Sequence, residues 1–145
     1  MMRIYEIAPG LLQSARTHTL SDQECKDILD NYGITAIVNL WHTADPRFEG
    51  SVRWYAHNSL PDGRIYDRAA EVVENLSIRV ADEIAKGGVV LVHCWGGRNR
   101  SGLVSALALT RLQGITGAEA VRAVRGVRRG ALVNQHFVTY LEKRL

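Results

Sequence analysis

The stretch HCWGGRNRSG at residues 93–102 decides the fold and the chemistry expected of this chain. It follows VVLV (89–92), an apolar run typical of a buried strand, and precedes LVSALALTRLQ (103–113), which is typical of a helix. Gly96 and Gly97 allow the connection to curl so that successive backbone N–H groups point inward. The sequence therefore predicts an anion-binding turn between a strand end and a helix N-terminus.

Cys94 and Arg100 stand at the two ends of this turn, with five residues between them. The planar guanidinium of an arginine matches two oxygens of a phosphate. The inward amides, the helix dipole and Arg100 together favour a thiolate at Cys94. We therefore expect a tetrahedral phosphate dianion to bind directly beside a nucleophilic sulfur. The plainer interpretations are a buried apolar cysteine and a glycine-rich turn that only binds phosphate.

Length and composition limit the class of protein. The 145 residues predict one domain covering 1–145, with 46% hydrophobic and 23% charged residues as in an ordinary globular protein. No apolar run is long enough for a membrane span or a secretory signal, and the two cysteines form neither a disulfide framework nor a zinc spacing. The expected compartment is the cytoplasm, with free thiols.

The net charge of +3 mildly favours anionic partners. Several arginines gather near the C-terminal end, and we interpret them as a solvated helix face. The alternative is a basic rim that attracts a phosphorylated substrate or RNA. These arginines are Arg122, Arg125, Arg128 and Arg129.

Strand and helix patterns alternate along the chain. Strands are expected at 3–14 (broken by Pro9-Gly10), 34–41, 52–60 and 89–93, and helices at 67–86, 101–113, 118–127 and 135–145. A further helix begins at the capping box of Ser21 and Glu24 and ends at Gly33. Its core stripe is expected to contain Cys25, Ile28, Leu29 and Tyr32, which makes Cys25 a packing residue. The predicted class is α/β: a central, mainly parallel sheet flanked by helices.

The segment His93-Cys94, five residues, Arg100-Ser101 resembles the phosphate-binding loop of the cysteine-dependent protein tyrosine phosphatases. The short chain most resembles their dual-specificity branch, and Asn134-Gln135-His136-Phe137 resembles the family's last-helix region. The resemblance implies hydrolysis of phosphotyrosine, and of phosphoserine or phosphothreonine, in proteins through a phosphocysteine intermediate, with no metal or other cofactor. It implies that Ser101 hydrogen-bonds the sulfur and that His93 braces the loop and helps keep the thiolate. The implied phosphate-binding residues are Trp95, Gly96, Gly97, Arg98, Asn99 and Arg100.

The resemblance also implies an aspartate on an upstream loop as general acid, often in a Pro-Asp pair. Leu60-Pro61-Asp62 supplies such a pair at a similar separation from Cys94. Asp67 is the rival, but it stands where a helix N-cap is expected. Asp45 is more remote in sequence. We therefore predict Asp62 as the acid, because a flexible loop can bring it to the leaving oxygen.

Other substrates and other classes of protein remain open from the sequence. Gly97-x-Asn99-Arg100 followed by a hydroxyl residue is similar to the loop of cysteine-type RNA triphosphatases, and Arg98 would suit an inositol phosphate. An RNA 5′-phosphatase or a phosphoinositide phosphatase is therefore the alternative. A phospho-reader without turnover and a sulfurtransferase are less favoured, because Cys94, Arg100 and an upstream aspartate are all present. Trp95 is expected either to form part of the pocket floor or to pack under the loop, and we favour packing.

Overall fold

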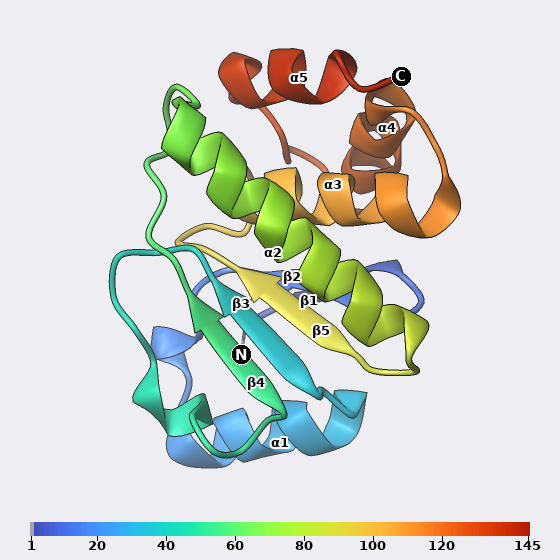
Figure 1. Cartoon of the computed structure of the whole chain (residues 1–145). Coiled ribbons are helices and arrows are strands. Elements are labelled where there is room, and N and C mark those ends of the chain that lie inside the picture. The colour runs from blue at the N-terminus through green and yellow to red at the C-terminus, as the bar shows by residue number, and fades with distance from the viewer. Residues whose placement is uncertain (1) are drawn as a thin grey trace.

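A five-stranded sheet forms the centre of the computed structural model, which describes residues 2–145 (Figure 1). The strand order is β1-β2-β5-β3-β4, and only the β1–β2 pair is antiparallel. The mainly parallel sheet predicted from the sequence is confirmed. The strands are β1 (Ile4–Ala8), β2 (Leu11–Ser14), β3 (Ala36–Asn39), β4 (Trp54–His57) and β5 (Val90–His93).

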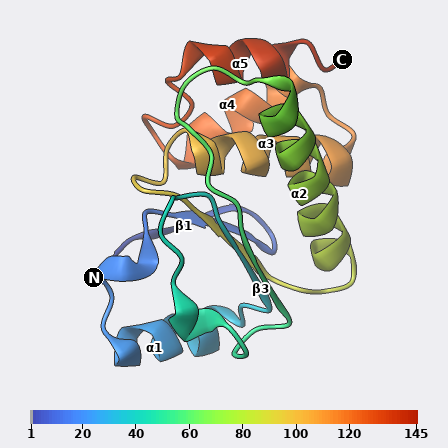
Figure 2. The same ribbon diagram turned by 60° about the vertical axis from the view of Figure 1, so that its left-hand side comes forward.

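Helices cover both faces of this sheet. Figure 2 shows α1 (Asp22–Tyr32) on one face, and α2 (Asp67–Ala85) and α3 (Arg100–Gln113) on the other. The helices α4 (Gly117–Val127) and α5 (Gln135–Glu142) lie beyond α3. Short 3-10 turns η1 (Thr17–Thr19) and η2 (Pro46–Phe48) lie in the connections next to α1 and after β3.

The sequence of β5 lacks polar alternation because both faces of the strand are buried. Val90 and Val92 are fully buried in the core beneath α2 and α3, whereas Leu91 is fully buried in the second core beside α1. A parallel strand with a core on each face needs apolar residues in both directions. The run at 89–92 therefore places β5 in the middle of the sheet and fixes where Cys94 emerges.

The helix boundaries confirm the clearest local signals and correct two details. Ser21 and Glu24 form both bonds of a capping box, and Gly33 ends α1 in the left-handed conformation with φ of 65°. Tyr32 is 43% exposed, so its place in the core stripe was wrongly predicted, because it lies in the last turn. The N-cap of α2 is Tyr66, and Asp67 lies inside the first turn, so the N-cap prediction for Asp67 is also wrong.

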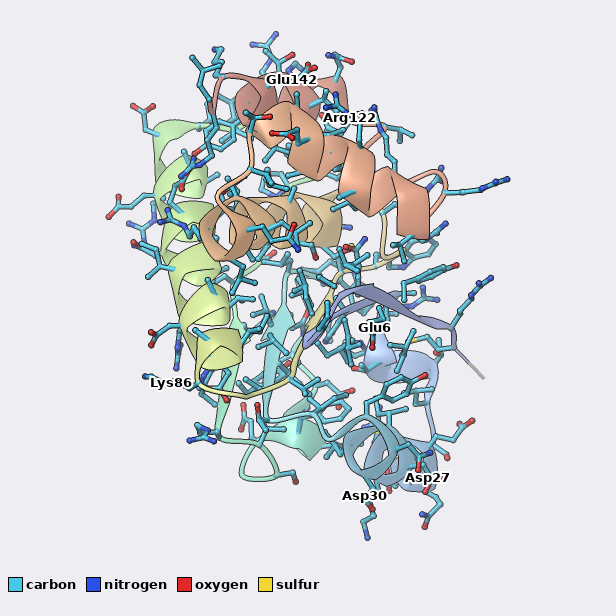
Figure 3. The ribbon with its side chains drawn as sticks, turned by 90° about the vertical axis from the view of Figure 1, so that its right-hand side faces the viewer. Glu6, Asp27, Asp30, Lys86, Arg122 and Glu142 are labelled. Carbon is cyan, nitrogen blue, oxygen red and sulfur yellow. The ribbon has the colours of Figure 1, made fainter. Side chains whose placement is uncertain are left out.

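The carboxylate of Glu74 links α2 to α3 and to the C-terminal region. Glu74 of α2 accepts hydrogen bonds from Arg111 of α3 and from Tyr140 and Arg144 in the C-terminal region. Figure 3 shows the labelled Arg122 and Glu142 on the outside of the molecule. The exposure of Arg122 agrees with a solvated face on α4.

Candidate active site

Three connections lie on the same side of the molecule, at and above the carboxyl ends of the parallel strands (Figure 2). They are the cysteine loop (residues 94–100) after β5, the acid loop (residues 58–66) between β4 and α2, and the α4–α5 connection (residues 128–134). Side-chain hydrogen bonds join all three. This edge is where open parallel sheets usually bind ligands.

The cysteine loop brings the predicted nucleophile and arginine together. Cys94 follows β5 directly and is 2% exposed, and its Sγ lies 3.3 Å from Oγ of Ser101 in the first turn of α3. Arg100 opens α3 and donates one hydrogen bond to the Leu60 carbonyl, at 3.2 Å. Its buried Nε has no partner among residues 2–145, so donor capacity remains for a ligand.

A small cleft lies over these groups. Its volume is about 220 Å³, which suits a phosphoryl group and the first atoms attached to it. Asp62 from the acid loop shares the cleft with the predicted nucleophile, so the structure brings together the three residues predicted as catalytic. The cleft is lined by Asp62, Cys94, Trp95, Gly96, Arg98, Asn99 and Arg100.

The N-terminus of α3 is left open toward this loop. Asn99 occupies the N-cap position in a helical conformation, and its side chain makes no capping hydrogen bond. By contrast, Ser21, Thr116 and Asn134 cap α1, α4 and α5. The uncapped amides and the helix dipole favour an anion at this end of α3.

Gly97 is required by a close approach of the cysteine loop to β2. Its φ is +68°, and a Cβ atom there would lie 2.5 Å from the carbonyl carbon of Ser14. The side chain of Gln13 in β2 supports the same point by donating to the Gly97 carbonyl, at 3.0 Å. Sequence reasoning missed Gln13, although a glutamine next to the buried leucines of β2 was a usable signal.

Trp95 forms a wall of the cleft instead of packing under the loop as predicted. Its side chain is 52% exposed, and the guanidinium of Arg16 lies 4.4 Å from its ring centroid. The backbone N–H of Arg16 also donates to the Trp95 carbonyl, at 3.1 Å. The arginine supports the indole from one side through a cation–π contact. Sequence reasoning did not identify Arg16.

The side chains of Arg98 and Asn99 hold the neighbouring connections. Arg98 donates from Nε to the Gly130 carbonyl, at 3.0 Å, and Asn99 bonds both the acid loop and the α4–α5 connection. Both residues also line the cleft, and their part in phosphate binding stays a prediction.

His93 is buried directly below Cys94. Burial, helped by the nearby His18, lowers the pKa of His93 to about 3, so its ring is neutral at physiological pH. Neither ring nitrogen has a hydrogen-bond partner within residues 2–145. The ring therefore supports the loop by packing, without adding positive charge.

The structure separates the three aspartates considered as the acid. Asp45 is 2% exposed and accepts bonds from Thr17 and Arg47. Burial alone would raise the pKa of Asp45, but the bonds and the charge of Arg47 outweigh it and hold that pKa at about 2. Asp67 lies in the first turn of α2. Asp62 is the one of the three that lines the cleft.

Within residues 2–145, no group of three or more histidine, cysteine, aspartate or glutamate side chains is arranged to hold a metal ion. In the same part of the chain, no helix has both the length and the apolar character needed to cross a membrane.

Comparison with known proteins identifies the family. The family model described as "Dual specificity phosphatase, catalytic domain" matches residues 18–144. Human dual specificity protein phosphatase 1 is 30% identical over 133 residues, which are 91% of this chain and 34% of that protein. Dual specificity protein phosphatase 1-A of Xenopus laevis is 29% identical over the same length. The chain thus spans about a third of the length of these curated relatives.

Solved structures give the same fold. Human DUSP28 superposes with a TM-score of 0.81 at 24% identity, covering 97% of this chain and 90% of that one. A mouse putative dual specificity phosphatase, solved with zinc tungstate, has a TM-score of 0.81 at 26% identity, covering 97% and 84%. These relatives are named as dual specificity phosphatases, so the comparisons do not favour an RNA 5′-phosphatase or a phosphoinositide phosphatase. The chain belongs to the dual specificity phosphatase branch of the cysteine-dependent protein tyrosine phosphatases.

Proposed function

We propose that residues 1–145 form a single catalytic domain that hydrolyses phosphotyrosine in proteins, and phosphoserine or phosphothreonine as well. One observation carries the proposal: Cys94, Arg100 and Asp62 line the same small cleft at the open N-terminus of α3. A nucleophile, an anion-binding fork and a proton donor are the parts that phosphoryl transfer through a covalent intermediate needs.

In the first step the sulfur of Cys94 attacks phosphorus. The S–P bond forms while the P–O bond to the substrate breaks, and Asp62 gives its proton to the departing oxygen. Arg100 and the amides of the cysteine loop hold the other phosphate oxygens, where charge is concentrated in the transition state. The products of this step are the free hydroxyl group and a phosphocysteine.

In the second step water replaces the sulfur. The carboxylate of Asp62 takes a proton from the water as its oxygen bonds to phosphorus and the S–P bond breaks. Ser101 Oγ, 3.3 Å from Sγ, stabilises the departing thiolate by donating a hydrogen bond. Inorganic phosphate leaves, and the enzyme returns to its starting state.

Trp95 supports phosphotyrosine as the preferred substrate. The half-exposed indole gives the cleft an aromatic wall that Arg16 holds in place. The ring of a phosphotyrosine can pack against such a wall, and this contact is not available to the shorter phosphoserine. The tungstate bound by the mouse relative, an oxyanion related to phosphate, supports an oxyanion site in the same family.

The cytoplasm is the compartment that we propose for this activity. Cys25 and Cys94 are both free thiols, and the mechanism needs Cys94 in its reduced form.

The decisive experiment measures phosphate release in EDTA from a phosphotyrosine peptide and from 5′-triphosphate RNA, side by side. We expect turnover of the peptide, and we expect Cys94→Ser to abolish it. Turnover that Cys94→Ser retains would overturn the cysteine mechanism. Faster release from RNA would keep the mechanism and overturn the protein substrate.

A further inference from the structure

Asp62 is held by two asparagine side chains that come from different parts of the chain. Nδ2 of Asn134 donates to Oδ1 of Asp62 at 2.8 Å, and Nδ2 of Asn99 donates to Oδ2 at 3.0 Å. Asn134 also donates to the carbonyl of Gly63, at 3.1 Å. Each carboxyl oxygen of Asp62 thus accepts one amide, and the arrangement joins the acid loop to the cysteine loop and to the start of α5.

The orientation of both amides is fixed by their other hydrogen bonds. Oδ1 of Asn134 caps α5 by accepting from the backbone N–H groups of His136 and Phe137. Oδ1 of Asn99 accepts from the backbone N–H groups of Val133 and Asn134, at 2.9 and 3.0 Å. Turning either amide over would set its NH₂ group against N–H donors. The NH₂ groups must therefore face Asp62.

Past Leu60, the only side-chain hydrogen bonds to the acid loop among residues 2–145 come from Asn99 and Asn134. Its earlier part is anchored by backbone bonds from Asn58 and Leu60 to β3 and the residue after it, and by Arg100 on the Leu60 carbonyl. Past Leu60 the loop has no regular secondary structure, and Asp62 is exposed. An exposed aspartate without fixed partners would sample several rotamers, whereas proton transfer needs the acid within hydrogen-bond reach of the leaving oxygen.

We propose that Asn134 is a positioning residue for the general acid Asp62, so that the first turn of α5 forms part of the catalytic apparatus. The inference rests on the proposed function. Each carboxyl oxygen has two acceptor sites, and each amide uses one of them. Asp62 can therefore keep both amide bonds while its proton passes to the ester oxygen as the P–O bond breaks and the S–P bond forms.

The test compares two substrates that differ in their need for an acid. Phosphotyrosine leaves as a phenol with a pKa of about 10 and needs the proton. Nitrophenyl phosphate carries an electron-withdrawing group, and its phenoxide leaves readily without one. Asn134→Ser keeps a side-chain oxygen to cap α5 but cannot reach Asp62 with a donor. We expect it to lower kcat/KM, which reports the first step alone, about 10-fold for the phosphotyrosine peptide, a part of what a general acid contributes, and less than 2-fold for nitrophenyl phosphate.

Tyr140→Phe is the matched control, because it removes a different anchor of α5, the hydroxyl bond to Glu74. It should change both rates equally and by less than 2-fold. Asn134→Asp serves as a second variant, because aspartate also caps a helix but cannot donate, and it should give the same selective loss. Thermal unfolding of each variant confirms that the protein measured is folded.

Measuring the effect of Asn134→Ser in an Asp62→Asn background separates the positioning role of Asn134 from the proposed function. If Asn134 acts through Asp62, Asn134→Ser has no further effect on kcat/KM there. An equal loss of kcat/KM on both substrates, or an undiminished loss in the Asp62→Asn background, would overturn the positioning role alone. If Asp62→Asn leaves the phosphotyrosine rate unchanged, the acid is wrongly assigned and the positioning role fails with it. If Cys94→Ser retains turnover, the proposed function fails.

Discussion

Two aspartates near the carboxyl edge of the sheet have opposite surroundings. Asp45, after β3, is buried, and both of its oxygens are bonded to the guanidinium of Arg47. Asp62, after β4, is exposed and meets the neutral amides of Asn99 and Asn134. The first carboxylate is hydrogen-bonded to a full positive charge, and the hydrogen-bond donors of the second are neutral amides.

This difference separates a structural carboxylate from one that can exchange protons. The pKa of Asp45 is held at about 2, so it stays ionised at physiological pH and serves to fix the loop after β3. An acid that donates and recovers a proton in each turnover cannot be tied to a cation in this way. Replacing each aspartate by asparagine should therefore affect stability in one case and catalysis in the other.

The largest expected effect on stability follows Asp45→Asn. The change removes the negative partner of Arg47 inside a mostly buried cluster, and we expect a loss of about 3 kcal/mol in the free energy of unfolding. Denaturant titration measures it. The remaining folded protein should keep its kcat, because Asp45 does not line the cleft. A large fall in kcat with unchanged stability would reverse the roles given to the two aspartates.

Asp62→Asn should give the opposite result. We expect kcat for the phosphotyrosine peptide to fall about 100-fold, the usual contribution of a general acid. Stability should change by less than about 0.5 kcal/mol, because the side chain is exposed. Steady-state kinetics and a denaturant titration on the same preparation provide the two numbers, and a stable enzyme of unchanged kcat would contradict the assignment.

The sequence was sufficient for features that depend on neighbouring residues. The apolar run at 89–92 located β5, the Ser21-Glu24 capping box located the start of α1, and the sheet is parallel where the pattern predicted it. The spacing of Cys94 and Arg100 depends only on a short loop, and the structure places both in one cleft. These signals are local, so a single sequence reveals them.

Features that depend on distant contacts were missed. Asn134 lies 72 residues from Asp62 in sequence, and Gln13 lies 84 residues from Gly97. Sequence patterns carry no record of which such pairs meet in space. The prediction for Trp95 failed for a related reason, since Arg16 and not the core supplies its packing partner.

The pH dependence of stability tests the state of Asp45. Its pKa is about 2 in the folded protein and near its ordinary value of 3.8 in the unfolded chain. The unfolded state therefore binds more protons in this range, and stability from Asp45 is present above about pH 4 and lost as the pH falls through 2. We expect the ionised Asp45 to contribute roughly 2 kcal/mol to the free energy of unfolding. The stability difference between the parent chain and Asp45→Asn should shrink by that amount between pH 6 and pH 2. A constant difference would show that Asp45 is not held ionised.

The smallest effect in this comparison concerns Thr17, which donates to Oδ2 of Asp45 at 2.7 Å in a buried position. Thr17→Val keeps the shape of the side chain and removes the donor, so we expect a loss of about 1.5 kcal/mol, typical of a buried hydrogen bond to a charged group. Thr139→Val is the matched control, because the hydroxyl of Thr139 bonds only the exposed Gln135 among residues 2–145. It should cost less than about 0.5 kcal/mol. Equal losses in the two variants would mean that the Asp45 cluster derives its stability from Arg47 alone.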